Sequence, residues 1–274
     1  MSIPAWPATV LIIGCGNMGG AMLTGWLRAG VPAERFTVVD PGLPEAPAGV
    51  ELLRGLPMDG RVFDVMLLGV KPQALDGVAP ALTALAGPDT VVLSILAGVE
   101  LASLSLRFAQ ARGILRVMPN LSAAVGKSPM GVAAMGLDHA ARDSAMAWLA
   151  PLGAPEWVAE ELFDAVTALA GCGPAFVYRF IDALAAGGVA LGLDSDQSLR
   201  LAQATVDGAA ALAASSPTPP GELARRVASP GGSTQAGLDV LDADAALARL
   251  IAATMAAARD RNAEMGAAAR GAAA

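Results

Sequence analysis

The feature that most constrains the fold is a glycine-rich turn between a short apolar strand and a helix. The apolar run Val10–Ile13 leads directly into Gly14-Cys15-Gly16-Asn17-Met18-Gly19, which matches the pattern G-x-G-x-x-G, and a helical pattern follows. A second apolar strand, Phe36–Val39, ends at Asp40, 21 residues after Gly19. A strand, a glycine turn, a helix and a second strand with an acid at its tip together indicate a dinucleotide-binding fingerprint.

Each glycine of the fingerprint has a separate expected role. Gly14 makes the turn, Gly16 lets the backbone approach a pyrophosphate, and Gly19 lets the helix pack on the strand. Asn17 and Met18 complete the predicted cofactor-binding residues of this turn.

Asp40 has two interpretations, and the sequence leaves both open. As an acceptor for the ribose 2′-hydroxyl, its carboxylate would favour NAD and repel the 2′-phosphate of NADP. Alternatively, Asp40 is solvated, and the turn Pro41-Gly42 directs the chain away from the cofactor.

The alternation of strands and helices continues through the first half of the chain. Apolar runs at 65–70, 91–95, 114–118 and 130–133 predict further buried strands. Continuous apolar strands separated by helix-length segments predict an α/β fold with a doubly wound parallel sheet of Rossmann type. Ligands of such sheets bind at the carboxyl ends of the strands, although ordinary loop residues also occur there. The predicted cofactor-binding residues at those ends are Val70, Lys71, Pro72, Ala97, Gly98 and Asn120.

The second half of the chain has a different pattern, with no strand candidates after residue 160. We therefore predict two domains: a dinucleotide-binding domain at 1–160 and an all-α domain at 161–274. The helices of the second domain are rich in alanine and glycine, which leads to the hypothesis of a homodimer formed through this domain. The low-complexity stretch 266–274 is predicted to be frayed.

A substrate-binding loop is predicted within the helical domain. The sequence Ser229-Pro230-Gly231-Gly232-Ser233-Thr234 reads as a loop that opens into a helix, with Ser233 as a good N-cap residue and glycines able to adopt positive φ. A helix N-terminus of this kind can hold a carboxylate. The competing interpretation is a simple Pro-Gly-Gly turn between two helices.

Composition excludes several classes of function. The net charge is −7 without a cluster of basic residues, so no nucleic-acid surface is expected, and two cysteines with a single histidine predict no metal site. The most apolar helical stretch, 176–193, contains Arg179 and Asp182 and is predicted to fall short of a membrane span. No signal peptide is expected, and a reducing cytoplasm is the simplest location.

The scarcity of acids and bases also limits the mechanism. The only lysines are Lys71 and Lys127, and His139 lies away from every strand tip. Hydride transfer to an iminium carbon fits this inventory, because it needs orientation rather than a strong protein acid. The 229–234 loop would hold a substrate carboxylate, and Thr234 could bond the ring nitrogen.

These residues resemble the pyrroline-5-carboxylate reductase family over nearly the whole chain. The most specific segment is 229–242, and four others match in the same order: 171–176, 116–120, 70–73 and the fingerprint. The resemblance implies NAD(P)H-dependent reduction of 1-pyrroline-5-carboxylate to L-proline, with NADPH most often preferred. It also implies substrate-carboxylate binding by Ser229, Gly231, Gly232, Ser233 and Thr234, with Thr234 as the catalytic contact to the ring nitrogen. Asn120 and the turn Lys71-Pro72 would lie by the nicotinamide, and the helical domains would interlock into a dimer or a ring of dimers.

Two residues depart from the family pattern. Cys172 stands where the family commonly has serine, and Asp40 stands where a 2′-phosphate binder would have a neutral or basic residue, although Arg35 could compensate. Two other functions remain as alternatives. A β-hydroxyacid dehydrogenase would need a lysine after Lys127, and a non-catalytic dinucleotide-binding protein would bind the cofactor without turnover.

Overall fold

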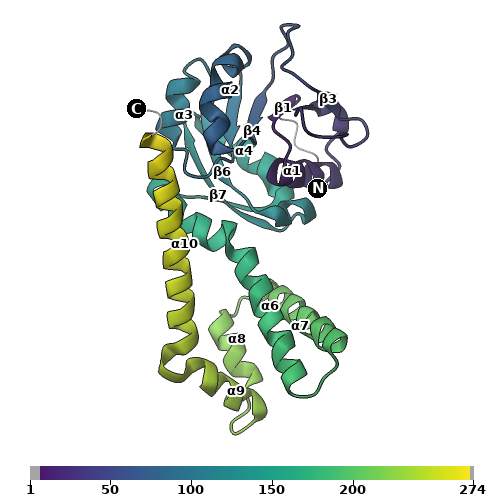
Figure 1. Cartoon of the computed structure of the whole chain (residues 1–274), viewed down its shortest axis with the longest axis vertical. Helices are drawn as coiled ribbons and strands as arrows, with labels where there is room; N and C mark the ends of the chain where they lie inside the picture. The colour runs from purple at the N-terminus through teal and green to yellow at the C-terminus, as the bar shows by residue number, and fades with distance from the viewer. Residues whose placement is uncertain (1–6, 272–274) are drawn as a thin grey trace. The chain divides into compact units, whose positions relative to one another are not determined.

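The computed structural model describes residues 7–271, which form two compact units (Figure 1). One unit contains the chain up to Cys172 together with 258–271, and the other is Gly173–Ala257. The division between compact units falls after Cys172, whereas the domain boundary predicted at residue 160 stays a prediction. The reason for the division after Cys172 is packing, because Phe163 is 1% exposed and belongs to the hydrophobic core of the first unit.

The first unit is built on an eight-stranded sheet in the order β3-β2-β1-β4-β5-β6-β7-β8. The predicted Rossmann-type sheet is confirmed. Strands β2 and β3 extend the sheet on one side of β1, and β4, β5 and β6 extend it on the other side, so the strand order changes direction at β1. The strands are β1 (Val10–Ile13), β2 (Phe36–Val39), β3 (Glu51–Leu53), β4 (Val65–Leu68), β5 (Val91–Ser94), β6 (Gly113–Met118), β7 (Ser128–Met135) and β8 (Gly153–Trp157).

One feature of the sheet corrects the prediction of a wholly parallel arrangement. Strand β7 pairs with β6 in the antiparallel direction, whereas the other neighbouring pairs are parallel. The connection between β6 and β7, residues 119–127, contains only the short helix η4 (Leu121–Val125). A connection of this length is too short for the crossover that a parallel neighbour requires.

The central strands β1 and β4 are apolar throughout because both faces of the sheet are covered there. Along β1, Val10 and Ile12 belong to one hydrophobic cluster, whereas Leu11 and Ile13 belong to the other. Alternate side chains of a strand point to opposite faces, so a strand buried on both faces reads as a continuous apolar run.

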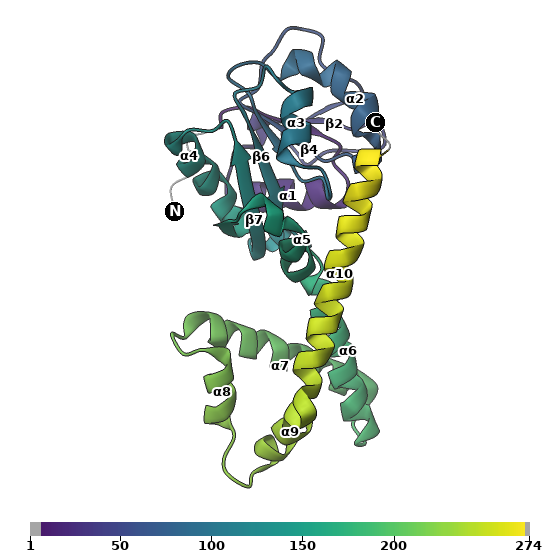
Figure 2. The same ribbon diagram turned by 90° about the vertical axis from the view of Figure 1, so that its left-hand side faces the viewer.

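Helices from different parts of the sequence cover the two faces (Figure 2). The first face packs against α1 (Asn17–Arg28) and α4 (His139–Leu149), and the second packs against α2 (Leu75–Leu82), α3 (Leu101–Arg107) and α5 (Phe163–Val166). Short helices complete the unit: η1 (Ala33–Arg35), η2 (Pro72–Ala74), η3 (Thr83–Leu85), η5 (Ala150–Leu152), η6 (Glu160–Leu162) and the π-helix η7 (Thr167–Gly171).

The second unit is entirely helical in the described residues, as predicted. It contains α6 (Gly173–Ala190), α7 (Ser195–Ser215), α8 (Pro220–Val227), α9 (Ser233–Asp242), η8 (Ala243–Ala245) and the first part of α10 (Ala246–Gly271). Helices α6 and α7 form a hairpin in which the Ser198 hydroxyl donates to the Ala185 carbonyl at 2.7 Å. Most other large apolar side chains of this unit are exposed in the single chain, including Tyr178, Phe180 and Leu250.

The last helix corrects the prediction of a frayed tail. Helix α10 continues to Gly271, and Gly266, in the part of the helix that belongs to the first unit, is buried. Residues 272–274 of the predicted tail lie outside the described residues.

One helical stretch overlaps the segment 176–193, which was predicted to fall short of a membrane span. The stretch Glu160–Ala190 is long and apolar enough to cross a membrane by length and composition. The predicted window began at residue 176, whereas the observed stretch takes in apolar residues before it. A single stretch of this kind is weak evidence, because helices that pack in a core or an interface have similar length and composition.

Candidate active site

The glycine turn after β1 has the geometry that its sequence pattern predicts. Gly14 has φ +83°, a conformation that favours glycine, and an added Cβ there would meet the Gly69 and Val70 backbone at 3.1 Å. An added Cβ at Gly19 would meet the Gly14 carbonyl oxygen at 2.9 Å, so helix and turn pack closely. By contrast, an added Cβ at Gly16 would meet nothing within 4 Å. The backbone at Gly16 is therefore open to a ligand.

The N-terminus of α1 completes a candidate anion-binding site. Helix α1 begins at Asn17, and its N-cap residue Gly16 provides no side-chain hydrogen bond to the first turn. Backbone N–H groups at such an uncapped N-terminus attract a phosphate. This turn therefore fits the diphosphate of a dinucleotide.

A cavity of about 590 Å³ lies beside this turn at the carboxyl ends of β1, β2 and β4. Ligands of doubly wound sheets bind at this end of the strands. The structure brings together part of the predicted cofactor set in the cavity lining, namely Gly14, Gly16, Asp40, Val70 and Lys71. The lining is mainly apolar elsewhere, with Leu56 and Val78 among its residues, and such a surface suits a flat adenine ring.

Asp40 is held in place by the backbone around it. One carboxylate oxygen, Oδ2, accepts from the Cys15 N–H at 2.8 Å, and the other, Oδ1, accepts from the N–H groups of Gly42 and Leu43 at 2.8 and 3.1 Å. The carboxylate therefore links the glycine turn to the loop after β2. Burial raises the pKa of the Cys15 thiol, and the charge of Asp40 raises it further, so the thiol stays protonated and is not a nucleophile at neutral pH.

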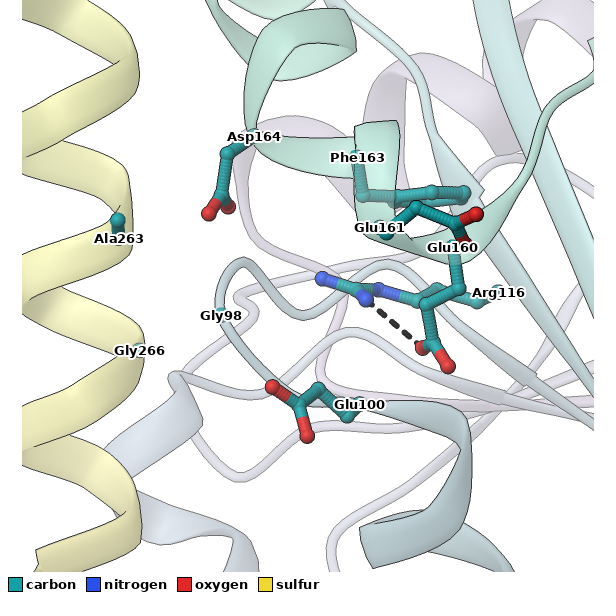
Figure 3. A pocket seen from close by; sticks show the side chains of 9 residues that line it. All are labelled: Gly98, Glu100, Arg116, Glu160, Glu161, Phe163, Asp164, Ala263 and Gly266. Carbon is teal, nitrogen blue, oxygen red and sulfur yellow. Dashed lines mark hydrogen bonds and ion pairs between the residues drawn. The ribbon is translucent and has the colours of Figure 1, made fainter.

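Other predicted cofactor residues do not line this cavity. Ala97 and Gly98 follow β5, and Gly98 lines a second cavity of about 420 Å³ in the same unit (Figure 3). The side chain of Asn120 is used within the protein, because its amide nitrogen donates to the Ala170 carbonyl at 2.7 Å and its oxygen accepts from the Ser122 N–H at 2.9 Å. The roles of Pro72, Ala97, Gly98 and Asn120 at a cofactor stay predictions.

The second cavity is lined by an ion pair, between a buried arginine and a partly exposed glutamate, that no sequence motif indicates. Arg116 is 3% exposed, and its Nη1 donates to Glu160 Oε1 at 2.9 Å (Figure 3). The same oxygen accepts from the Leu101 N–H, at the start of α3, at 2.7 Å. The guanidinium also lies 4.3 Å from the centroid of the Phe163 ring. The signal in the sequence is a single charged residue within the apolar run 114–118.

Helix α10 packs against the turn at Gly98. Gly98 has φ +74°, and an added Cβ there would lie 2.9 Å from the Cα of Gly266. Two glycines thus allow the turn and the helix to touch. No pattern in the sequence predicts this contact, because the stretch around Gly266 has low complexity.

The predicted substrate loop lies in the second unit. Gly231 has φ +71°, whereas Gly232 has φ −83°, so only the first glycine uses the left-handed region. The expectation that Ser233 is the N-cap is wrong: the N-cap is Gly232, and Ser233 begins α9. Ser229, Ser233 and Thr234 are exposed, and α9 has no side-chain cap. The loop keeps the open helix N-terminus that a carboxylate requires.

No group of three or more His, Cys, Asp or Glu side chains among the described residues could hold a metal ion. What the described residues do provide is the glycine turn, the uncapped helix and the adjoining cavity. The sheet order and this turn define a Rossmann-type dinucleotide-binding protein. Comparison with known proteins identifies the family within this class.

Two family models match the chain. One, described as pyrroline-5-carboxylate reductase dimerisation, matches residues 160–265, and one described as NADP oxidoreductase coenzyme F420-dependent matches residues 9–98. The chain is 35% identical to a pyrroline-5-carboxylate reductase of Pseudomonas aeruginosa, over 93% of this chain and 96% of that protein. It is 38% identical to one of Glycine max, over 94% and 96% of the two chains. The chain belongs to the pyrroline-5-carboxylate reductase family.

A solved structure agrees with this assignment. A pyrroline-5-carboxylate reductase from Coxiella burnetii has a TM-score of 0.86 to this chain at 27% identity, and the match covers 94% of this chain and 98% of that one. The dimerisation family model includes residues that are exposed in the single chain, such as Phe180 and Leu250.

Proposed function

We propose that this chain reduces 1-pyrroline-5-carboxylate to L-proline with NAD(P)H, as the last step of proline biosynthesis. The observation that carries the proposal is family membership over nearly the whole chain, including the relative that covers 93% of it. The open glycine turn and the uncapped loop at 229–234 provide the two kinds of binding surface that this reaction needs.

The cofactor-binding role is assigned to residues of the first unit. The backbone of Gly14, Gly16, Asn17, Met18 and Gly19 would hold the diphosphate at the start of α1. Asp40 would lie at the adenosine ribose. Lys71, Pro72 and Asn120 would lie toward the nicotinamide, and Val70, Ala97 and Gly98 are the remaining predicted cofactor contacts.

The substrate-binding role is assigned to the 229–234 loop. Its backbone N–H groups and the hydroxyls of Ser229 and Ser233 would bind the substrate carboxylate, and Thr234 would bond the ring nitrogen. When bound, the cofactor would supply the hydride that reduces the imine carbon, so that the ring nitrogen of an iminium substrate becomes the amine of proline. The chain contributes orientation and charge complementarity, because a substrate that arrives as the iminium needs no proton from the protein.

The assembly and location belong to the same proposal. The dimerisation family match supports association through the helical unit, and the exposed apolar side chains of that unit are consistent with it. We propose a homodimer, which could assemble further into a ring of dimers, acting in the cytoplasm without a nucleic-acid or membrane partner.

The test is the consumption of NADH and NADPH with 1-pyrroline-5-carboxylate, followed by absorbance. We expect Thr234→Ala to lower kcat/KM by about 100-fold, the scale of losing a substrate-orienting contact. Thr205→Ala is the matched control, because Thr205 is an exposed threonine of the same unit whose hydroxyl bonds only within its helix, to the Leu201 carbonyl. Equal losses in both variants would contradict the role of Thr234, and cofactor binding without turnover in the wild type would favour the non-catalytic alternative.

A further inference from the structure

We propose that the cofactor site of this chain selects NADH over NADPH, and that the carboxylate of Asp40 makes the selection. The inference rests on the proposed function, because it concerns the cofactor of the same site. It depends on how Asp40 is held and on which cations near it are available.

The carboxylate of Asp40 cannot turn away from the cavity without losing hydrogen bonds on both oxygens. It accepts three backbone N–H bonds, from Cys15 on Oδ2 and from Gly42 and Leu43 on Oδ1. The Cys15 N–H belongs to the glycine turn itself, so the charge is fixed beside the diphosphate seat. A loop rearrangement that removed the charge would also break the turn Asp40–Leu43.

The hydrogen-bonding capacity of this carboxylate suits a hydroxyl. An ionised carboxylate offers about four acceptor positions. Three are used, which leaves about one, on the oxygen Oδ2 that has a single donor. A ribose 2′-hydroxyl would donate to that position. A 2′-phosphate has no donor to offer at neutral pH, and its charge repels the carboxylate.

Arg54 and Arg35 already donate hydrogen bonds to carbonyl groups of the protein. Arg54 follows β3 at the edge of the site, and its guanidinium donates to the carbonyl oxygens of four loop residues: Asp40, Pro41, Leu43 and Pro44. Arg35 donates from Nη1 to the Pro7 carbonyl at 3.1 Å. The compensation that Arg35 might have provided is therefore not what the structure shows.

The cationic side chain that lines the cavity belongs to Lys71, which lies on the other side of the glycine turn from Asp40. Lys71 is the one Lys or Arg among the residues lining the cavity, and it follows β4. In the sheet order, β1 lies between β2 and β4, so the ends of β2 and β4 are about 10 Å apart at the backbone. Lys71 thus lies away from the 2′ position, which faces the carboxylate of Asp40 and the loop 41–43, whose residues have no polar side chain. To reach a 2′-phosphate, the Arg54 guanidinium would have to leave its carbonyl acceptors in that loop.

The experiment measures binding to the purified full-length protein without substrate. Isothermal titration calorimetry gives the dissociation constants of NAD⁺, 2′-deoxy-NAD⁺ and NADP⁺. We expect NAD⁺ to bind about 100-fold more tightly than NADP⁺, a ratio that corresponds to the cost of opposing like charges. We expect the dissociation constant of 2′-deoxy-NAD⁺ to lie between those of NAD⁺ and NADP⁺, about 10-fold above that of NAD⁺. The deoxy compound lacks the hydroxyl that donates to Asp40 but adds no charge.

Three variants separate the charge of Asp40 from other effects. Asp40→Asn removes the charge, and we expect the ratio of the NADP⁺ to the NAD⁺ dissociation constant to fall by at least about 10-fold. Glu45→Gln removes the same charge from the same loop at an exposed position that does not line the cavity, and it should leave the ratio unchanged. Lys71→Met should weaken both dinucleotides by a similar factor, because the nicotinamide half, toward which Lys71 is proposed to lie, is the same in both.

Several results would overturn the inference. One is equal or tighter binding of NADP⁺ by the wild type, and another is the same change of ratio in Asp40→Asn and Glu45→Gln. If Asp40→Asn binds neither dinucleotide, the test is the ratio of the NADP⁺ to the NAD⁺ dissociation constant of the wild type at increasing salt. Salt screens charge, so the ratio should fall if charge causes the preference, and an unchanged ratio would overturn the inference. Preference for NADP⁺ with intact turnover would overturn this inference alone, whereas failure of the wild type to bind any dinucleotide would overturn the proposed function as well.

Discussion

The sheet unit and the helical unit bury their apolar residues in different ways. In the first unit, each face of the sheet has its own cluster of buried side chains, with Trp26 and Trp148 on one face and Phe163 on the other. In the second unit, the buried side chains among the described residues are Ala185, Ser198 and Ala202, which are all small. Large apolar residues such as Phe180 are 50% exposed there.

This difference shows where each unit obtains its stability. A sheet covered on both faces completes its core within one chain. Exposed apolar surface on a scale beyond scattered residues marks an interaction site. The match of residues 160–265 to a dimerisation family agrees with this interpretation, because it covers the unit with the small internal core. The three predictions below test this contrast, beginning with the largest expected effect.

The largest effect is expected from the core of the first unit. Trp148 is fully buried, and its ring lies 4.8 Å from that of Trp26 and 6.1 Å from that of Phe36, centroid to centroid. Trp148→Ala should lower the free energy of unfolding by about 3–5 kcal/mol, because it removes a large buried ring and leaves a cavity. Urea denaturation measures this loss. Trp157→Ala is the control, because Trp157 is 38% exposed, and equal losses in the two variants would contradict a core within this unit.

The next effect is expected on association. Leu250 lies on α10 in the helical unit and is 64% exposed in the single chain. Leu250→Asp should raise the dimer dissociation constant by about 100-fold, because it places a charge in an apolar interface. Light scattering over a range of protein concentrations measures this change. Leu106→Asp is the control, because Leu106 is 83% exposed on α3 of the sheet unit, and a similar loss of dimer in that variant would break the contrast.

The smallest of the three effects is expected at the start of the dimerisation match. Glu160→Ala removes the partner of the buried Arg116 and the acceptor of the Leu101 N–H. We expect the free energy of unfolding to fall by about 2 kcal/mol, less than for a fully buried pair because Glu160 is 28% exposed. Glu160→Gln keeps an acceptor for Leu101 and should cost about half as much. Glu161→Ala changes an exposed neighbour, and a loss equal to that of Glu160→Ala would show that the ion pair is unimportant.

Much of the sheet unit could be predicted because its local signals agree with its tertiary structure. Apolar runs coincide with β1, β2, β4, β5 and β6, and Gly14, Gly16 and Gly19 have the environments that the fingerprint predicts. The strands β3 and β8 were not predicted. Both lie outside the fully buried centre of the sheet, with half-buried and exposed residues that carry no continuous apolar run.

The remaining features depend on contacts between distant residues, which periodicity does not report. The ion pair of Arg116 with Glu160 joins residues 44 positions apart, and the contact of Gly98 with Gly266 needs the far end of the chain. The internal role of the Asn120 amide depends on the carbonyl of Ala170, 50 positions away. The capping of α9 by Gly232 rather than Ser233 is a shift of one residue, a detail that helix signals rarely resolve.

The packing of Gly266 on the Gly98 turn has a consequence for the order of folding during synthesis. Residues 258–271 belong to the same compact unit as the sheet, yet they are translated after the whole helical region. A nascent chain can form the strands and the glycine turn early, because domains tend to fold as their residues emerge. The turn at Gly98 stays uncovered until the last helix has left the ribosome. The N-terminal unit is therefore the first to begin folding and the last to be completed.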